Sequence, residues 1–235
     1  MKRTITILIL IAAVTSLSAQ NSCGTVKDYD GNTYSTVQIG EQCWMKENLR
    51  TTHFSDGTAI PDGSDGDDKR ADVKPYYYDY SGSNIPLSAR GYLYNWTAAK
   101  RACPTGWHLP SDREWKSLTS YVYNQSKYVC GGYTESIAKA LASTEYWERS
   151  EDNECSAGDQ SRHPNNATGF SAVPAGDCAG KDFCCAGRRT IFWSSSCVGE
   201  YPCEISCPYL RYNGGGVTEG FYRKTYGFSV RCLRD

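Results

Sequence analysis

Twelve cysteines in a chain of 235 residues constrain its folding more than any other feature. They are Cys23, Cys43, Cys103, Cys130, Cys155, Cys178, Cys184, Cys185, Cys197, Cys203, Cys207 and Cys232. In an oxidising compartment disulfides are the default, and an even number allows complete pairing in a connectivity that the spacing does not select. Adjacent cysteines have Cα atoms ~3.8 Å apart, below the ~4.4–6.8 Å usual for a bridge. We therefore predict that Cys184 and Cys185 pair with different cysteines.

The N-terminus predicts export from the cytoplasm. Lys2 and Arg3 precede an apolar run over residues 5–14, which is shorter than the ~20 residues of a membrane span. Small residues follow, so we predict a signal peptide over residues 1–19 with cleavage near Ala19. The chain is then secreted, surface-associated or periplasmic, and has no membrane span after cleavage.

The charge balance argues against polyanionic partners. The chain has 25 basic and 26 acidic residues, and loss of Lys2 and Arg3 with the leader leaves 23 and 26, a net charge of −3. Nucleic-acid binding requires a concentration of positive charge. We therefore predict no nucleic-acid partner.

The first half of the chain predicts one hairpin, a long loop and a capped helix. Asp30-Gly31 lies between two β-prone runs, which is typical of a two-residue hairpin turn. Residues 48–90 contain few apolar side chains, so we expect a surface loop. Ser111 and Glu114 have the spacing of a capping box. The apolar side chains that follow recur at helical intervals.

The second half predicts little regular structure. A short helix fits residues 134–143, and short strands fit residues 169–174, 190–195 and 208–212. The last ten residues alternate apolar and polar side chains, as a strand does. Helices followed by short strands and long loops predict an α+β fold in one domain over residues 20–235.

Six ordered segments resemble the Fibrobacter succinogenes major paralogous domain family. They are GTVKDYDGNTYSTVQIGEQCWMKENLRTT, GYLYNW, CPTGWHLPSDREW, GFSAVPAG, FWSSS and YGFSVRCLRD, and they extend over residues 23–235. The resemblance implies an exported bacterial protein, similar to C-type lectin-like and formylglycine-generating-enzyme-like folds. We therefore expect a C-type lectin-like domain with two short helices, small antiparallel sheets, long loops and several disulfides. By the same analogy, Cys103 would pair with Cys232.

The segment CPTGWHLPSDREW, residues 103–115, admits two interpretations. Cys103 and His108 could form a nucleophile and a base, which requires a thiolate and an orienting group. The alternative is a disulfide cysteine, a turn and a histidine at the start of a helix. We favour this structural interpretation, and we predict no catalytic residues because no acid-base, serine-triad or phosphate-cradling motif is recognisable.

Two metal sites are conceivable, and we predict neither. Cys197, Cys203 and Cys207 could bind zinc together with His163, but zinc needs thiolates and competes with oxidation. The acidic run DGSDGDD supplies Asp62, Asp65, Asp67 and Asp68, oxygen ligands that suit calcium, without the EF-hand spacing. Lectin-type calcium motifs are also missing from the sequence, so we expect no cofactor.

Four tyrosines are the candidate ligand-binding residues. Tyr76, Tyr77, Tyr78 and Tyr80 lie in the long loop. A tyrosine ring offers an apolar face and a polar tip, which suits saccharide stacking and protein interfaces. The alternative is that the rings attach the loop to the domain.

We interpret the chain as an exported, disulfide-rich binding or adhesion module whose partner is a cell-surface glycan or protein. One alternative is a secreted enzyme or modifying factor related to the formylglycine-generating fold. Another is a structural subunit of a surface or pilus assembly. An enzyme needs a concave pocket with converging titratable groups, whereas an adhesin needs an exposed aromatic or polar patch.

Overall fold

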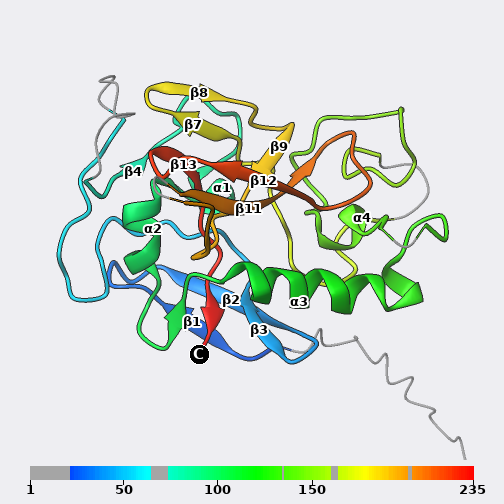
Figure 1. The fold of residues 1–235 in the computed structure, drawn as a ribbon, viewed down its shortest axis with the longest axis horizontal. Helices are drawn as coiled ribbons and strands as arrows, with labels where there is room; N and C mark the ends of the chain where they lie inside the picture. The colour runs from blue at the N-terminus through cyan, green and yellow to red at the C-terminus, as the bar shows by residue number, and fades with distance from the viewer. Residues whose placement is uncertain (1–21, 65–73, 134, 160–163, 201–202) are drawn as a thin grey trace, which may run out of the picture.

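The computed structural model of this chain describes residues 22–64, 74–133, 135–159, 164–200 and 203–235. Three antiparallel sheets and a few short helices make up this part of the chain, as expected for an α+β fold (Figure 1). No helix in these ranges is long and apolar enough to span a bilayer.

The first sheet combines strands from the two ends of the described chain. Its order is β1-β2-β3-β14-β6. The strands are β1 (Thr25–Lys27), β2 (Thr33–Ile39), β3 (Gln42–Met45), β14 (Leu233–Arg234) and β6 (Trp107–His108). Leu233 pairs with both Trp44 and His108, so the last strand lies between β3 and β6.

The other two sheets form the upper part of the molecule in Figure 1. The second contains β9 (Arg189–Ile191), β10 (Cys197–Val198), β11 (Glu204–Arg211) and β12 (Thr218–Tyr222), with β11 paired to the other three. The third has the order β4-β5-β13-β7-β8: β4 (Tyr77–Tyr78), β5 (Leu93–Tyr94), β13 (Tyr226–Ser229), β7 (Asp177–Ala179) and β8 (Asp182–Cys184). Parallel bridges from Gly176 to Thr190 and from Phe192 to Ser229 connect the two sheets.

The helices are short apart from α3. They are α1 (Leu87–Arg90), α2 (Trp96–Ala102), α3 (Asp112–Tyr123), the 3₁₀ helix η1 (Ser126–Tyr128) and α4 (Ala138–Leu141). The predicted capping box of α3 is present: Ser111 Oγ accepts from the Glu114 amide and the Glu114 carboxylate accepts from the Ser111 amide. Helix α3 contacts both β2 and β11, and it runs between the first and second sheets (Figure 1).

The N-terminal hairpin has a longer turn than predicted. Lys27 pairs with Thr33, which leaves residues 28–32 in the loop. Asp28 accepts hydrogen bonds from the amide of Asn32 and the hydroxyl of Tyr34, at 2.9 and 2.5 Å. The Asp28 side chain thus closes a wider turn than Asp30-Gly31 alone would form.

The expected loop and the expected second helix also differ from the structure. The segment 48–90 contains α1 and β4, and it buries the apolar side chains of Phe54, Ile60 and Ile85. The helix predicted over 134–143 is a single turn, α4. Residues 169–174 contribute only a bridge between Ala142 and Ala172. Tertiary burial, which periodicity does not encode, decides these segments.

Five disulfides form among the twelve cysteines. They are Cys23–Cys43, Cys103–Cys232, Cys130–Cys155, Cys184–Cys185 and Cys197–Cys203. The bond between Cys103 and Cys232 is the pair that the lectin analogy implied. Complete pairing does not occur, because Cys178 and Cys207 are buried free thiols.

The prediction that Cys184 and Cys185 have different partners is wrong. They bond to each other with their Cα atoms 3.7 Å apart. Cys185 has φ 69°, in the left-handed region, and its carbonyl accepts from the amides of Arg188 and Arg189. This tight turn brings the two neighbouring sulfur atoms together. The usual range of Cα–Cα distances describes cysteines that are distant in sequence and does not cover this case.

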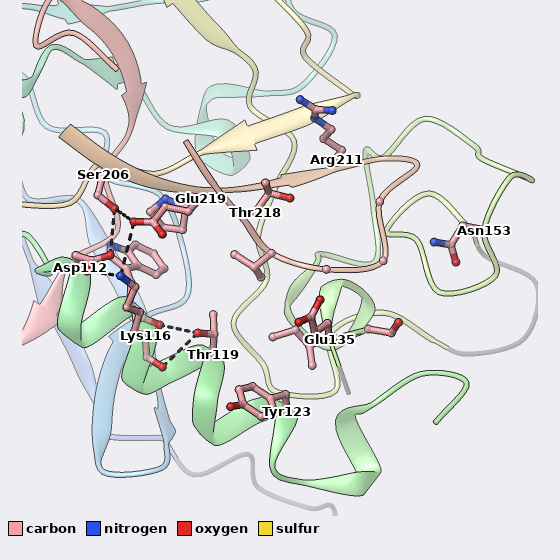
Figure 2. A pocket seen from close by; sticks show the side chains of 18 residues that line it. Asp112, Lys116, Thr119, Tyr123, Glu135, Asn153, Ser206, Arg211, Thr218 and Glu219 are labelled. Carbon is pink, nitrogen blue, oxygen red and sulfur yellow. Dashed lines mark hydrogen bonds and ion pairs between the residues drawn. The ribbon is translucent and has the colours of Figure 1, made fainter. Parts of the chain in front are cut away.

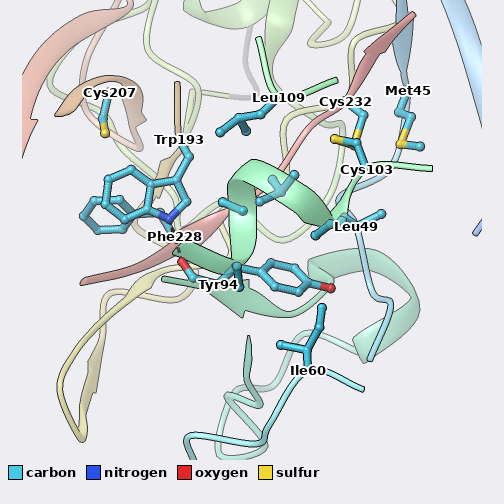
Figure 3. Packing of buried hydrophobic residues seen from close by; sticks show 14 of the residues in the cluster. Met45, Leu49, Ile60, Tyr94, Cys103, Leu109, Trp193, Cys207, Phe228 and Cys232 are labelled. Atoms are coloured by element: carbon cyan, nitrogen blue, oxygen red, sulfur yellow. Dashed lines mark hydrogen bonds between the residues drawn. A yellow bond between two sulfur atoms is a disulfide. The ribbon is translucent and has the colours of Figure 1, made fainter. Parts of the chain in front are cut away.

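The main core gathers around Trp193 and Phe228, whose ring centroids are 4.6 Å apart (Figure 3). The indole nitrogen of Trp193 donates to the carbonyl of Tyr94 over 2.6 Å. The Cys103–Cys232 disulfide belongs to the same core. Packing around this bond joins the end of α2 to the C-terminal segment.

Candidate binding cleft

Helix α3 aligns four polar side chains beside the second sheet. Asp112, Lys116, Thr119 and Tyr123 recur at three- or four-residue intervals, which places them along one side of a helix. Figure 2 shows this row below the hairpin of β11 and β12. The apolar side of α3 is buried, so the core fixes the direction in which the polar row points.

The second sheet and three further parts of the chain complete an open cleft of about 640 Å³. On β11, Ser206 and Pro208 face the cleft, and Glu219 of β12 is the register partner of Pro208. The far end is lined by residues 135–137, Asn153 and the glycines 214–216. The cleft therefore brings together parts of the chain that are distant in sequence.

A charged network occupies one end of the cleft. Lys116 Nζ lies 2.7 Å from Asp112 Oδ2 and 3.7 Å from Glu219 Oε1. The buried hydroxyl of Ser206 lies 3.0 Å from Asp112 Oδ1 and 2.6 Å from Glu219 Oε1. Since a hydroxyl has one hydrogen, Ser206 donates to one carboxylate at a time. Ser206 and Lys116 together hold the carboxylates of Asp112 and Glu219 close to each other.

The network suits hydrogen bonding better than nucleophilic chemistry. The hydrogen bond to Asp112 and the charge of Glu219 raise the pKa of Lys116, so its ammonium stays protonated at neutral pH. A protonated lysine cannot remove a proton from Ser206. The carboxylate oxygens and the ammonium instead supply hydrogen-bond acceptors and donors to the surface of the cleft.

Exposed aromatic side chains lie on the same surface as the cleft. Tyr123, which lines it, is 41% exposed. Phe221 is 48% exposed and pairs with Ser206 across β11 and β12. Directly paired residues of antiparallel strands project from the same side of a sheet, so Phe221 shares the side of Ser206. The surface thus combines polar groups with two accessible ring faces.

A close backbone approach sets the far end of the cleft. The carbonyl of Gly215 accepts from the amide of Ala138 over 2.8 Å. A Cβ atom at Gly216 would lie 2.9 Å from the carbonyl oxygen of Glu135. Any side chain at position 216 would therefore push the turn away from the segment before α4 and change the shape of the cleft.

The family of the chain follows from a comparison of its sequence with known families. The profile of the Fibrobacter succinogenes major domain matches residues 37–234. The chain belongs to this family. The match begins within β2, so the preceding strand β1 lies before it. No curated protein and no solved structure shows significant similarity to the chain.

In this Fibrobacter succinogenes major domain, the segment 103–115 is a structural corner. Cys103 is in a disulfide and offers no thiolate. His108 lies 2.6 Å from Asp235 through Nδ1 and 3.0 Å from Glu114 through Nε2. Desolvation lowers the pKa of His108, but the hydrogen bonds to these two carboxylates outweigh it and raise the pKa overall. His108 thus joins the helix cap to the C-terminal residue.

The candidate tyrosines of this family member do not form a stacking surface. Tyr78 is fully buried and Tyr76 is 8% exposed, so neither ring presents a face at the surface, as the packing alternative expects. Tyr77 is half-buried and packs against Tyr92, with ring centroids 4.7 Å apart. Tyr80 is half-buried against Phe183, at 5.0 Å. The rings thus attach the loop to the domain, together with the buried side chains of Phe54, Ile60 and Ile85.

The conceivable metal ligands are in other environments or outside the described residues. Cys197 and Cys203 bond to each other, and His163 lies outside the described residues. Asp65, Asp67 and Asp68 lie outside them as well. Asp177, Cys184 and Cys185 have ligand atoms within 4.8 Å of one another. The two sulfurs are joined, however, and Arg189 pairs with Asp177 over 2.5 Å.

The residues of the cleft were missed by sequence reasoning. A signal was present on α3, where Asp112 and Lys116 have the i, i+4 spacing of a helical ion pair and Thr119 and Tyr123 continue the row. No comparable signal marks Ser206 or Glu219, because only the pairing of β11 with β12 brings them to α3.

Proposed function

We propose that this Fibrobacter succinogenes major domain is an exported binding module whose cleft recognises a glycan at a cell surface. The observation that carries the proposal is the cleft itself. Two carboxylates and an ammonium share this surface with the exposed rings of Tyr123, which lines the cleft, and Phe221, which lies on the same side of the sheet as Ser206. Ligand sites combine apolar faces with a few polar groups that fix the orientation of the ligand. A saccharide matches both, since its hydroxyls need polar partners and its ring can stack on an aromatic face.

The connectivity supports a C-type lectin-like architecture as part of this proposal. Strands from the two ends of the described chain meet in one sheet, and the Cys103–Cys232 bond joins α2 to the C-terminal segment. Five disulfides suit a chain with long loops that works outside the cytoplasm, because cross-links restrict the unfolded chain.

We also propose that the module acts by binding, without calcium and without catalysis. An enzyme of the formylglycine-generating kind would need an activated thiol. Burial raises the pKa of the Cys178 thiol to about 12 and also raises that of Cys207, the opposite of activation. Neither thiol lines the cleft.

A glycan array probed with the mature protein tests the proposal. The strongest ligand is then titrated against the wild type, Tyr123→Ala and Glu219→Gln, with and without a calcium chelator. We expect each variant to weaken binding about tenfold or more, equivalent to ~1.4 kcal/mol, and we expect the chelator to have no effect. Tyr133→Ala is the matched control, since Tyr133 is 72% exposed and lies outside the cleft.

Other outcomes identify the alternatives. Equal binding by the wild type and both cleft variants would show that the ligand binds outside the cleft. A structural role in a surface assembly would be favoured by two results together. The protein would bind no glycan on the array, and a pull-down would capture a copy of the chain or a pilus-type subunit. Turnover of a captured ligand would favour an enzyme.

A further inference from the structure

Two arginines face each other directly at the edge of the second sheet. Arg189 of β9 and Arg211 of β11 are register partners in the antiparallel pair. Like charges in this position repel each other and destabilise the sheet.

These arginines belong to a small pocket of about 250 Å³. Its lining is Cys185, Arg188, Arg189, Arg211, Tyr212 and Asn213. Three of the six lining residues are arginines, which concentrates positive charge at this hollow in a chain whose net charge is close to zero. We call this hollow the arginine pocket.

Two of the guanidiniums are held in place by the protein. Arg189 makes a bidentate contact with the buried carboxylate of Asp177, at 2.5 and 2.8 Å. Arg188 lies over the ring of Tyr212 at 4.9 Å, donates to its hydroxyl at 3.1 Å, and pairs with Glu148 at 3.4 Å. Two carboxylates therefore balance two of the three cations.

Arg211 is the cation left without a balancing charge. Its guanidinium lies 5.0 Å from the centre of the Tyr209 ring, and it has no hydrogen bond or ion pair to any other described residue. A guanidinium has five N–H donors in a planar fork that matches an oxyanion. The pocket lining thus includes one exposed guanidinium without a carboxylate partner and two that are paired with carboxylates.

We propose that the arginine pocket binds an oxyanion, namely the carboxylate or sulfate group of an acidic glycan. That the oxyanion belongs to a glycan rests on the proposed function. That the pocket binds an oxyanion rests on the arginines alone. Arg211 borders the cleft at its backbone end, while its guanidinium points away from the cleft toward β9 (Figure 2). The turn after β11 separates the two hollows. A glycan in the cleft reaches the pocket by crossing this turn.

The test uses monosaccharides that isolate the anion. Glucuronate, glucose 6-sulfate and neutral glucose are titrated calorimetrically into the intact mature protein at low salt. We expect one or both acids to bind and glucose to bind at least tenfold more weakly. The stronger acid identifies the natural group as a carboxylate or a sulfate. Arg211→Gln should weaken acid binding at least tenfold, whereas the exposed Arg113→Gln on α3 should not.

Thermal unfolding provides a second readout that also reports folding. Without anion, Arg211→Gln should have the same melting temperature as the wild type or a higher one, since it removes the repulsion from Arg189. The acid should raise the melting temperature of the wild type and of Arg113→Gln, but not that of Arg211→Gln. Equal stabilisation of the wild type and Arg211→Gln would overturn the proposal, as would no response to either acid.

The cleft variants separate this proposal from the proposed function. Tyr123→Ala should leave binding of the free acids unchanged, because Tyr123 lies in the cleft and not in the arginine pocket. If neutral glycans bind in the cleft and neither acid binds, the arginine pocket is refuted and the cleft function stands. If the acids bind through Arg211 and no glycan binds, the anion site stands and the cleft function is refuted.

Discussion

Arg231 donates from both Nε and Nη2 to a single acceptor, the amide oxygen of Asn48, over 3.2 and 2.6 Å. Both side chains are buried. The remaining donors of Arg231 reach the carbonyls of Met45, Phe170 and Ser171. The guanidinium thus joins the C-terminal segment to two distant parts of the chain. Burial lowers its pKa to about 9, which leaves it charged at neutral pH.

Replacing Asn48 should destabilise the whole fold. Asn48→Ala removes an acceptor from a buried cation, and hydrogen bonds to charged groups contribute about 1.5–3 kcal/mol each. We expect the free energy of unfolding in urea to fall by about 2–4 kcal/mol. The exposed Asn124→Ala is the control and should change stability by less than about 0.5 kcal/mol. A similar loss in both variants would show that the contact with Arg231 is unimportant.

The ion pairs of His108 should make stability depend on pH. Because the folded pKa of His108 is raised, its contribution is fully present below the unfolded value and is lost as the pH rises through the folded value. We expect the wild type to exceed His108→Gln in unfolding free energy by about 0.5 kcal/mol at pH 5.5, with solvent screening included. The difference should shrink by pH 8.5. A difference that grows with pH would contradict the assignment.

Alkylation measures which cysteines are free. Burial and the raised thiol pKa values predict that Cys178 and Cys207 do not react in the native protein. After unfolding without reductant, these two should be labelled and no others. Peptide mapping should recover the other ten in their five pairs, including Cys184 with Cys185. Labelling of either vicinal cysteine would refute that bond.

Tyr78 should behave as a core residue. Its ring lies against two glycines, since a Cβ atom at Gly63 or Gly227 would approach it within 2.5 or 2.8 Å. Tyr78→Ala should lower the free energy of unfolding by about 3–5 kcal/mol, as is typical of a buried aromatic truncated to alanine. The exposed Tyr133→Ala should have little effect. Loss of glycan binding at unchanged stability would instead restore Tyr78 as a ligand contact.

Local signals predicted the local features well. The capping box of α3 depends on residues three apart, Ser111 and Glu114, and it is present as expected. The turn at Asp30-Gly31 was placed correctly, but its length was not, because the Asp28 side chain closes the loop. The helix predicted over 134–143 shrinks to four residues, where burial of α4 and the approach of Gly215 limit it.

The sequence by itself determined the family, the mixed architecture and the main helix, since each is carried by ordered motifs or by spacing within one segment. Only the tertiary structure decided the cleft and the arginine pocket. Ser206 forms a hydrogen bond with Asp112, which lies 94 positions away in the sequence. Arg189 lies opposite Arg211 because β9 and β11 pair in that register. These long-range contacts depend on how sheets and helices pack, so no local sequence pattern predicts them. Packing likewise decided the place of the loop tyrosines, since Tyr76 and Tyr78 are buried in the core while Tyr77 and Tyr80 are half-buried against other rings.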